Sequence, residues 1–199
     1  AGMIHPGMSR TGRRPAAIPF HATMLAFLTT DAAIAARPLQ RALEAAVARS
    51  FNRITVDGDM STNDTVLILA NGLAGNPASG LRLPTSRDSQ VFQSALDHVC
   101  LELAKKIVRD GEGVTRFVTV RVSGARNFAE ADAAARAVGN SALVKTSWFG
   151  GDPNWGRIID ALGYSAAQIV EHKVDIGYSA PGSREVLWSL KRGQPTPAA

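Results

Sequence analysis

Apolar residues follow two different spacings along this chain, and the spacing separates expected strands from expected helices. Two continuous apolar runs, at 24–29 and 65–70, predict buried strands, and the second run is closed by the turn dipeptide Asn71-Gly72. Further short strands are predicted at 54–56, 117–122, 143–146 and 174–176.

A spacing of about four between apolar side chains predicts helices. It marks a helix over 39–47, a long amphipathic helix over 92–107 and an Ala-rich helix over 129–138. The long helix should end at 110–111, because Gly suits a helix C-cap. Asp152-Pro153 is expected to open another helix, with Asp as the cap and Pro in the first turn.

Strands and helices are interspersed, which favours an α/β or α+β fold with packed layers. The length of 199 residues fits one domain or two tightly packed halves. Gly and Pro make loops of 1–22 and 73–88, and the tail from Gly193 is expected to fray.

Composition narrows the class of protein. Hydrophobic residues make up 45% of the chain and charged residues 20%, enough for a packed core and too apolar for overall disorder. Cys100 is the single cysteine, which excludes an intrachain disulfide and a multi-cysteine zinc site. No apolar stretch approaches the roughly 18 residues of a membrane span. The net charge is +5, but the basic residues are scattered and lack interleaved aromatics, so a nucleic-acid partner is disfavoured.

Thr23 is a candidate nucleophile, because its hydroxyl stands between a small residue, Ala22, and a predicted buried strand. A β-branched residue is also common at the start of a strand. The residues alone favour this second interpretation.

Three polar segments are further candidates. Residues 57–64 place polar groups between two predicted strands, where they either build a turn or line a pocket. Glu112 lies between two glycines after the long helix, and taken alone it is best explained as a solvated side chain. Residues 150–156 combine two glycines with a helix start, which attracts anions but is explained more simply by close packing. The four histidines show no metal spacing.

Four stretches taken together resemble the ornithine acetyltransferase (glutamate N-acetyltransferase) family of arginine biosynthesis, mainly its β chain. They are GMIHPGM with ATMLAFLTTDAAI, then SFNRITVDGDMSTNDTVLILANG, LAKKIVRDGEG and LVKTSWFGGDPNWGRIIDALGYS. The resemblance covers roughly residues 1–8 and 22–165, in order. With this resemblance, Thr23 is better interpreted as a nucleophile than as an ordinary strand residue, and Glu112 as a substrate-binding residue rather than a solvated side chain.

The resemblance implies an α/β fold layered as an αββα-type sandwich, and a precursor that cuts itself between Ala22 and Thr23. The freed Thr23 would be the nucleophile, with its own α-amine as general base, because an α-amine titrates near neutrality. It would take acetyl from N-acetylornithine, and glutamate would collect it. Glu112 would bind substrate, since a carboxylate suits the amines of ornithine. No metal or organic cofactor is implied, and acetyl-CoA as a second donor is left open.

The resemblance also implies partners. The α chain of the same precursor would pair with this chain in an α2β2 assembly, with no nucleic-acid or membrane partner. Bacterial members are cytoplasmic and fungal members mitochondrial. The family's oxyanion-hole Thr-Gly pair and a substrate-binding Lys come before the matched stretch, and its C-terminal substrate residues do not match this chain.

On this basis, 1–22 is expected to be a remnant of the α-chain end, 23–192 the β-chain-like catalytic domain and 193–199 a flexible tail. An insertion at 9–21 separates the two matched pieces, and it could relax the strained peptide bond that cutting requires. Two alternative functions stay open. One is an amidohydrolase or aminopeptidase with an N-terminal nucleophile, in which water replaces glutamate, and the other is an inactive, unprocessed fragment.

Overall fold

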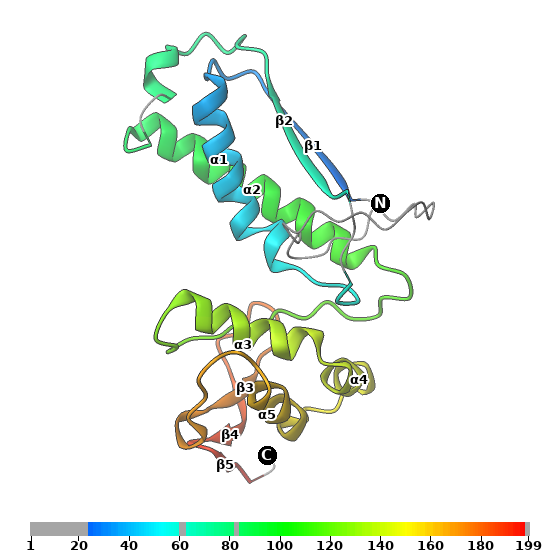
Figure 1. The fold of residues 1–199 in the computed structure, drawn as a ribbon. Coiled ribbons are helices and arrows are strands. Elements are labelled where there is room, and N and C mark those ends of the chain that lie inside the picture. Colours follow the sequence, from blue (N-terminus) through cyan, green and yellow to red (C-terminus); the bar gives the residue numbers. More distant parts are fainter. Residues whose placement is uncertain (1–23, 60–62, 82–83, 198–199) are drawn as a thin grey trace, which may run out of the picture. The chain divides into compact units, whose positions relative to one another are not determined.

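The computed structural model describes residues 24–59, 63–81 and 84–197, which form an α/β fold in two compact units divided between Val114 and Thr115 (Figure 1). The elements of the first unit are β1 (Leu25–Thr30), α1 (Ala36–Arg49), the 3-10 helix η1 (Phe51–Arg53), β2 (Thr65–Ala70), the 3-10 helix η2 (Ala78–Leu81) and α2 (Arg87–Arg109).

Strands β1 and β2 pair in parallel, in a register that runs from Leu25 opposite Thr65 to Thr30 opposite Ala70. Parallel neighbours need a crossover connection, and α1 lies in it. Figure 1 shows both helices of the unit on one side of the strand pair. Ala26 and Leu28 point to that side, where they form a core with residues of α1, η1 and α2. Both apolar runs predicted as strands are confirmed.

The opposite side of the strand pair is apolar and exposed. We call it the outer face, and it consists of Leu25 (56% exposed), Phe27 (65%), Leu67 (41%) and Leu69 (59%). The alternation of side chains along a strand produces both faces at once, since neighbouring residues point in opposite directions. Parallel sheets are ordinarily covered on both faces, so this outer face is unusual for a finished sheet.

Helix α2 confirms the predicted long helix and begins earlier than its apolar pattern. The hydroxyl of Ser86 caps it by accepting a hydrogen bond from the Ser89 amide at 3.3 Å. Leu96, Cys100 and Ala104 recur at a spacing of four and are the buried residues of the helix. Its other end lies at Asp110, as the sequence predicts.

The second unit contains three helices and a small sheet. Its elements are α3 (Phe128–Asn140), α4 (Ala142–Gly150), α5 (Trp155–Gly163), the 3-10 helix η3 (Glu171–Lys173), β3 (Ile176–Tyr178), β4 (Leu187–Lys191) and β5 (Gln194–Pro195). The strands pair antiparallel in the order β3, β4, β5. Residues of α3, α4 and α5 form the core, with Val144 and Ala161 fully buried.

The strand predicted at 143–146 is wrong, because this segment belongs to α4. The hydroxyl of Ser141 accepts from the Val144 amide and caps the helix, and Gly151 ends it with a left-handed φ of 71°. The buried residues, Val144 and Ser147, are three apart and so lie on one helical face. A short apolar run does not separate a buried helix from a buried strand.

The strands predicted at 54–56 and 117–122 are also absent among the described residues. Alternate side chains of the second segment, Val120 and Val122, pack on the core of the second unit, so the alternating pattern is used without a paired strand. The predicted cap Asp152 is wrong by two residues. Asn154 caps α5 by accepting from the Arg157 amide at 3.0 Å, while Asp152 accepts from the Asn154 side chain.

The last described residues include a strand, β5, that pairs with β4. The strand expected at 174–176 forms slightly later, as β3. Gln194–Pro195 form β5 against β4 within the segment expected to be a flexible tail, because the turn at Arg192-Gly193 reverses the chain. No helix within 24–59, 63–81 and 84–197 is both long and apolar enough to cross a membrane.

Replacing Leu96 by Ala is expected to lower the free energy of unfolding by roughly 2–5 kcal/mol, because the change removes buried methyl groups and leaves a cavity. Leu96 is 6% exposed on the inner side of α2. Urea denaturation measures the loss. Leu101→Ala, in the same helix at 38% exposure, is the control and should cost less than about 1 kcal/mol. If the two variants lost the same free energy of unfolding, the burial of Leu96 on the inner side of α2 would be contradicted.

Candidate functional site

The backbone just before β1 is held by the residues that lead into β2. The amide of Met24 donates a hydrogen bond to Oδ1 of Asp64 at 3.0 Å, and its carbonyl accepts from the Thr65 amide at 2.8 Å. The Met24 side chain is 3% exposed and belongs to the core. The start of β1 is therefore fixed by its backbone and by its side chain.

Thr23 is joined to this fixed residue by a peptide bond. The predicted nucleophile Thr23, the predicted cleavage site Ala22–Thr23 and the insertion 9–21 all lie outside the described residues. Their roles stay predictions. The structure describes only Met24, the residue that follows Thr23, and the contacts that hold it.

The described part of 57–64 has two separate roles. Oδ1 of Asp57 accepts from the Asp59 amide at 2.9 Å, which builds a turn, as one of the two sequence interpretations expects. Asp64 instead reaches across to Met24, and its second oxygen, Oδ2, is buried without a hydrogen-bond partner among the described residues. Asp64 thus faces the N-terminal side of β1 with one oxygen unused.

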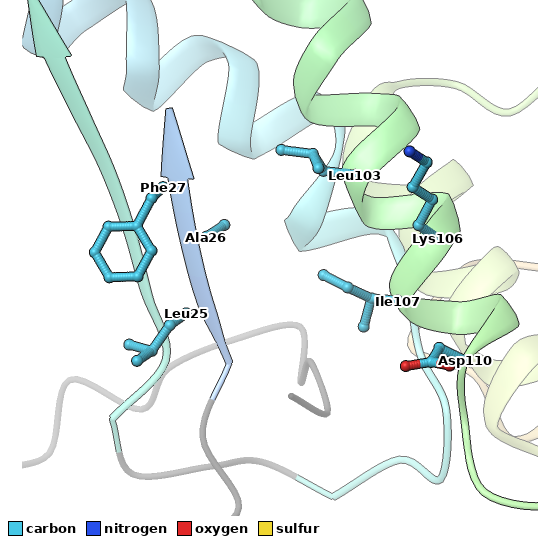
Figure 2. Close-up of a pocket in the computed structure, with 7 residues that line it drawn as sticks. All are labelled: Leu25, Ala26, Phe27, Leu103, Lys106, Ile107 and Asp110. Atoms are coloured by element: carbon cyan, nitrogen blue, oxygen red, sulfur yellow. The ribbon is translucent and has the colours of Figure 1, made fainter. Parts of the chain in front are cut away.

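A pocket of about 390 Å³ lies between β1 and the C-terminal end of α2 (Figure 2). Leu25, Ala26 and Phe27 line it from β1, and Leu103, Lys106, Ile107 and Asp110 line it from α2. Leu103 and Ile107 project from α2 toward β1 in Figure 2. The walls are mostly apolar, and the two charged groups, Lys106 and Asp110, are one helical turn apart and of opposite sign.

Glu112 lies at a tight turn two residues beyond this pocket-lining Asp110. The turn is closed by the Val114 amide, which donates to the Gly111 carbonyl at 3.1 Å. A Cβ at Gly111 would lie 3.2 Å from a methyl group of Val56 and 2.8 Å from one of Val114, so the turn packs closely only with glycine there. Glu112 itself is exposed. Its side chain is therefore available to a ligand from a fixed position at the end of α2.

The segment 150–156 serves packing in this structure. Gly151 supplies the left-handed residue that ends α4, and Asn154 caps α5. The amide of Arg157, which would otherwise face an anion, is bonded to Asn154 at 3.0 Å. This agrees with the simpler of the two sequence interpretations.

Burial raises the pKa of two other reactive side chains, Cys100 and Tyr178. Cys100 is fully buried, and burial raises the pKa of its thiol to about 11, so the thiol is neutral at pH 7. Burial also raises the pKa of Tyr178 in the second unit. Among the described residues, no group of three or more His, Cys, Asp or Glu side chains is placed to hold a metal ion.

Sequence reasoning missed Asp64 and Lys106. Asp64 was one polar residue among several, and its contact with Met24 spans 40 positions, which no local pattern reveals. Lys106 had a detectable signal, since it stands one helical turn before Asp110 at the end of an amphipathic helix.

Comparisons with known proteins agree on one family. The ArgJ family model matches residues 1–198. The chain is 53% identical over 176 residues to the arginine biosynthesis bifunctional protein ArgJ of Symbiobacterium thermophilum, covering 88% of this chain and 40% of that protein. It is 46% identical over 195 residues to the glutamate N-acetyltransferase of Methanocaldococcus jannaschii, covering 98% of this chain and 44% of that protein.

A solved structure agrees with these relatives. The crystal structure of arginine biosynthesis bifunctional protein ArgJ from Bacillus halodurans matches with a TM-score of 0.80 at 45% identity, over 88% of this chain and 78% of the crystallised chain. The chain spans less than half the length of the curated relatives described above.

Proposed function

Because this chain belongs to the ArgJ family, we propose that it forms the nucleophile-bearing part of an acetyltransferase that moves acetyl from N-acetylornithine to glutamate. The observation that carries the proposal is the fixed start of β1, where Met24 follows Thr23 directly and a pocket opens beside the strand. The names of the relatives, which include a glutamate N-acetyltransferase, support the reaction class. We place the reaction in the cytoplasm, since those relatives come from bacteria and an archaeon.

The transfer proceeds in two balanced steps. Oγ1 of Thr23 attacks the acetyl carbon of N-acetylornithine, so a C–O ester bond forms, the C–N amide bond breaks and the hydroxyl proton passes through the Thr23 α-amine to the departing ornithine amine. The amine of glutamate then attacks the ester carbonyl carbon, so a C–N amide bond forms, the C–O ester bond breaks, and a proton from that amine passes to Oγ1 of Thr23. One amide is made for each amide broken, so the exchange requires no cofactor.

The free α-amine exists only after the Ala22–Thr23 bond is cut. In the cut, Oγ1 of Thr23 attacks the Ala22 carbonyl carbon, and an ester replaces the amide while the Thr23 nitrogen takes the proton. Water then hydrolyses the ester, which leaves a carboxylate on Ala22 and a free amine on Thr23. Processing and transfer thus use the same nucleophile.

The pocket beside β1 suits an amino-acid substrate. Ala26 lines it from β1 and Leu103 and Ile107 line it with apolar side chains from α2, which favours exclusion of water from a reactive ester. Lys106 offers a cation to a substrate carboxylate, and the carboxylates of Asp110 and Glu112 offer partners to substrate amines. An ornithine derivative carries both kinds of charge.

The outer face of β1 and β2 supports the proposed partner. Its four exposed large residues would be covered by a second segment, as the α chain of the same precursor would do in an α2β2 assembly and an αββα-type sandwich.

Replacing Thr23 by Ala is expected to abolish both cutting and acetyl transfer, because Ala has no nucleophilic oxygen. The test expresses the chain with the upstream segment that the resemblance predicts and measures intact masses and acetyl exchange between N-acetylornithine and glutamate. Thr23→Ser keeps a hydroxyl and should keep both activities. A parent chain that stays uncut would instead support the inactive-fragment alternative, and release of acetate faster than transfer would support the amidohydrolase alternative.

Replacing Glu112 by Gln is expected to raise KM for N-acetylornithine roughly 10- to 100-fold, as for loss of a hydrogen bond to a charged group. The rate at saturation should change less, because the carboxylate binds substrate and does not attack it. Steady-state kinetics on the processed enzyme measures both constants. Glu44→Gln, an exposed position on α1, should leave them unchanged. If KM and kcat of the Glu112→Gln variant equal those of the parent enzyme, Glu112 does not bind substrate.

Replacing Leu69 by Glu is expected to prevent association with the upstream segment, because a charge would be buried in an apolar interface. Co-purification of the chain with a tagged upstream segment measures the association. Leu73→Glu, at 81% exposure just outside β2, is the control and should not affect binding. Binding that survives the Leu69 change would show that the outer face is not the contact surface.

A further inference from the structure

Helix α2 carries two neighbouring couples of opposite charge near its C-terminal end, and only one of them is closed. Nζ of Lys105 donates to Oε1 of Glu102 at 2.8 Å, with the acid nearer the start of the helix, which is the favourable order. Lys106 and Asp110 stand in the opposite order, and within the described part of the chain no ion pair joins them. The second couple therefore keeps both charges available to a ligand.

The helix itself does not explain why residue 110 is acidic. Asp110 is the C-cap residue of α2, and its backbone amide donates to the carbonyl of Lys106 at 3.0 Å, which any residue except proline could do. A carboxylate at this end faces the negative pole of the helix dipole, which is unfavourable. The Asp110 side chain lines the pocket beside β1. Its charge is thus better explained by the pocket than by the helix.

Lys106 and Asp110 lie on the face of α2 that borders the pocket. The helix lines the pocket with residues 103, 106, 107 and 110, whose spacings of three and four place them on one face. Leu103 and Ile107 project toward β1, and Asp110 extends from the end of the same helix (Figure 2). An apolar wall therefore runs beside two opposite charges that are one helical turn apart.

The proposed reaction brings two different side chains into one pocket. The side chain of N-acetylornithine ends in an ammonium, whereas that of glutamate ends in a carboxylate. Both molecules have an α-carboxylate, so the charge at the far end of the side chain is what most distinguishes them. A single fixed charge would attract one side chain and repel the other. A pocket that serves both half-reactions therefore requires a cation and an anion close together.

We propose that Lys106 and Asp110 are the specificity-determining residues of this pocket, and that each binds the side-chain charge of one substrate. This inference rests on the proposed function. Asp110, with Glu112 beyond it, binds the ammonium of N-acetylornithine, and Lys106 binds the side-chain carboxylate of glutamate. Leu103 and Ile107 contact the methylene groups of either side chain. After ornithine leaves, glutamate occupies the same space with its side-chain end at the base instead of the acid.

Two single substitutions test this assignment, because each should affect only one half-reaction. Lys106→Gln is expected to lower kcat/KM for glutamate roughly 10- to 100-fold, as for loss of a hydrogen bond to a charged group, and to change that for N-acetylornithine by less than about twofold. Asp110→Asn is expected to give the reverse pattern. Steady-state kinetics on the processed full-length enzyme measures kcat/KM for each substrate, which reports the half-reaction of that substrate.

The closed couple on the same helix supplies matched controls. Lys105→Gln and Glu102→Gln remove the same kinds of charge, and neither residue is among the described residues that line the pocket, so both variants should match the parent. A variant that keeps one half-reaction at the parent rate is folded. Acetyl exchange between N-acetylornithine and labelled ornithine requires no glutamate, and it should survive the Lys106→Gln change.

Two outcomes would overturn the inference. Equal losses for both substrates in Lys106→Gln would mean that this lysine binds the α-carboxylate, which the substrates share. Constants equal to those of the Lys105→Gln control would mean that Lys106 does not contact substrate. Failure of the proposed function gives a different result, because the parent enzyme would then neither transfer acetyl to glutamate nor exchange it with labelled ornithine.

Discussion

The parallel pairing of β1 with β2 is the constraint on which the first unit depends. The register from Leu25 opposite Thr65 to Thr30 opposite Ala70 turns Ala26 and Leu28 toward the helices. A slip of one residue would turn them outward and place the larger Leu25 and Phe27 against the helices, where the core is fitted to Ala26 and Leu28. The same register brings Asp64 to Met24, so the packing of the core and the geometry at the strand start are set together.

The sequence was a good guide to elements whose signal is local. Periodicity identified α2, and the apolar runs identified β1 and β2, because each pattern records which faces are buried. It failed at 143–146, where the cap at Ser141 and the glycine at 151 decide for a helix. It also failed at 117–122, where Val120 and Val122 alternate to pack on the core of the second unit without forming an assigned strand, so an alternating pattern alone does not establish one.

The candidate site was only partly readable from the sequence. Thr23 and Glu112 were ambiguous by residue type and became candidates through the family resemblance. Asp64 was missed because its role arises from a hydrogen bond to Met24 across 40 positions, and only the fold brings these residues together. The turn at Gly111 depends partly on the fold in the same way, since a Cβ there would approach the nearby Val114 and also Val56, which belongs to a distant segment.

Two features of the first unit are unfavourable when considered alone: the exposed outer face and the Asp64 oxygen that has no hydrogen-bond partner within the described part of the chain. Natural proteins keep such features where function compensates for them. The outer face belongs to β1 and β2, and Asp64 directly precedes β2, so the register of the strand pair determines both features. Because Asp64 directly precedes β2, its hydrogen bond from the Met24 amide and the continuous outer face both form only when β2 has paired with β1.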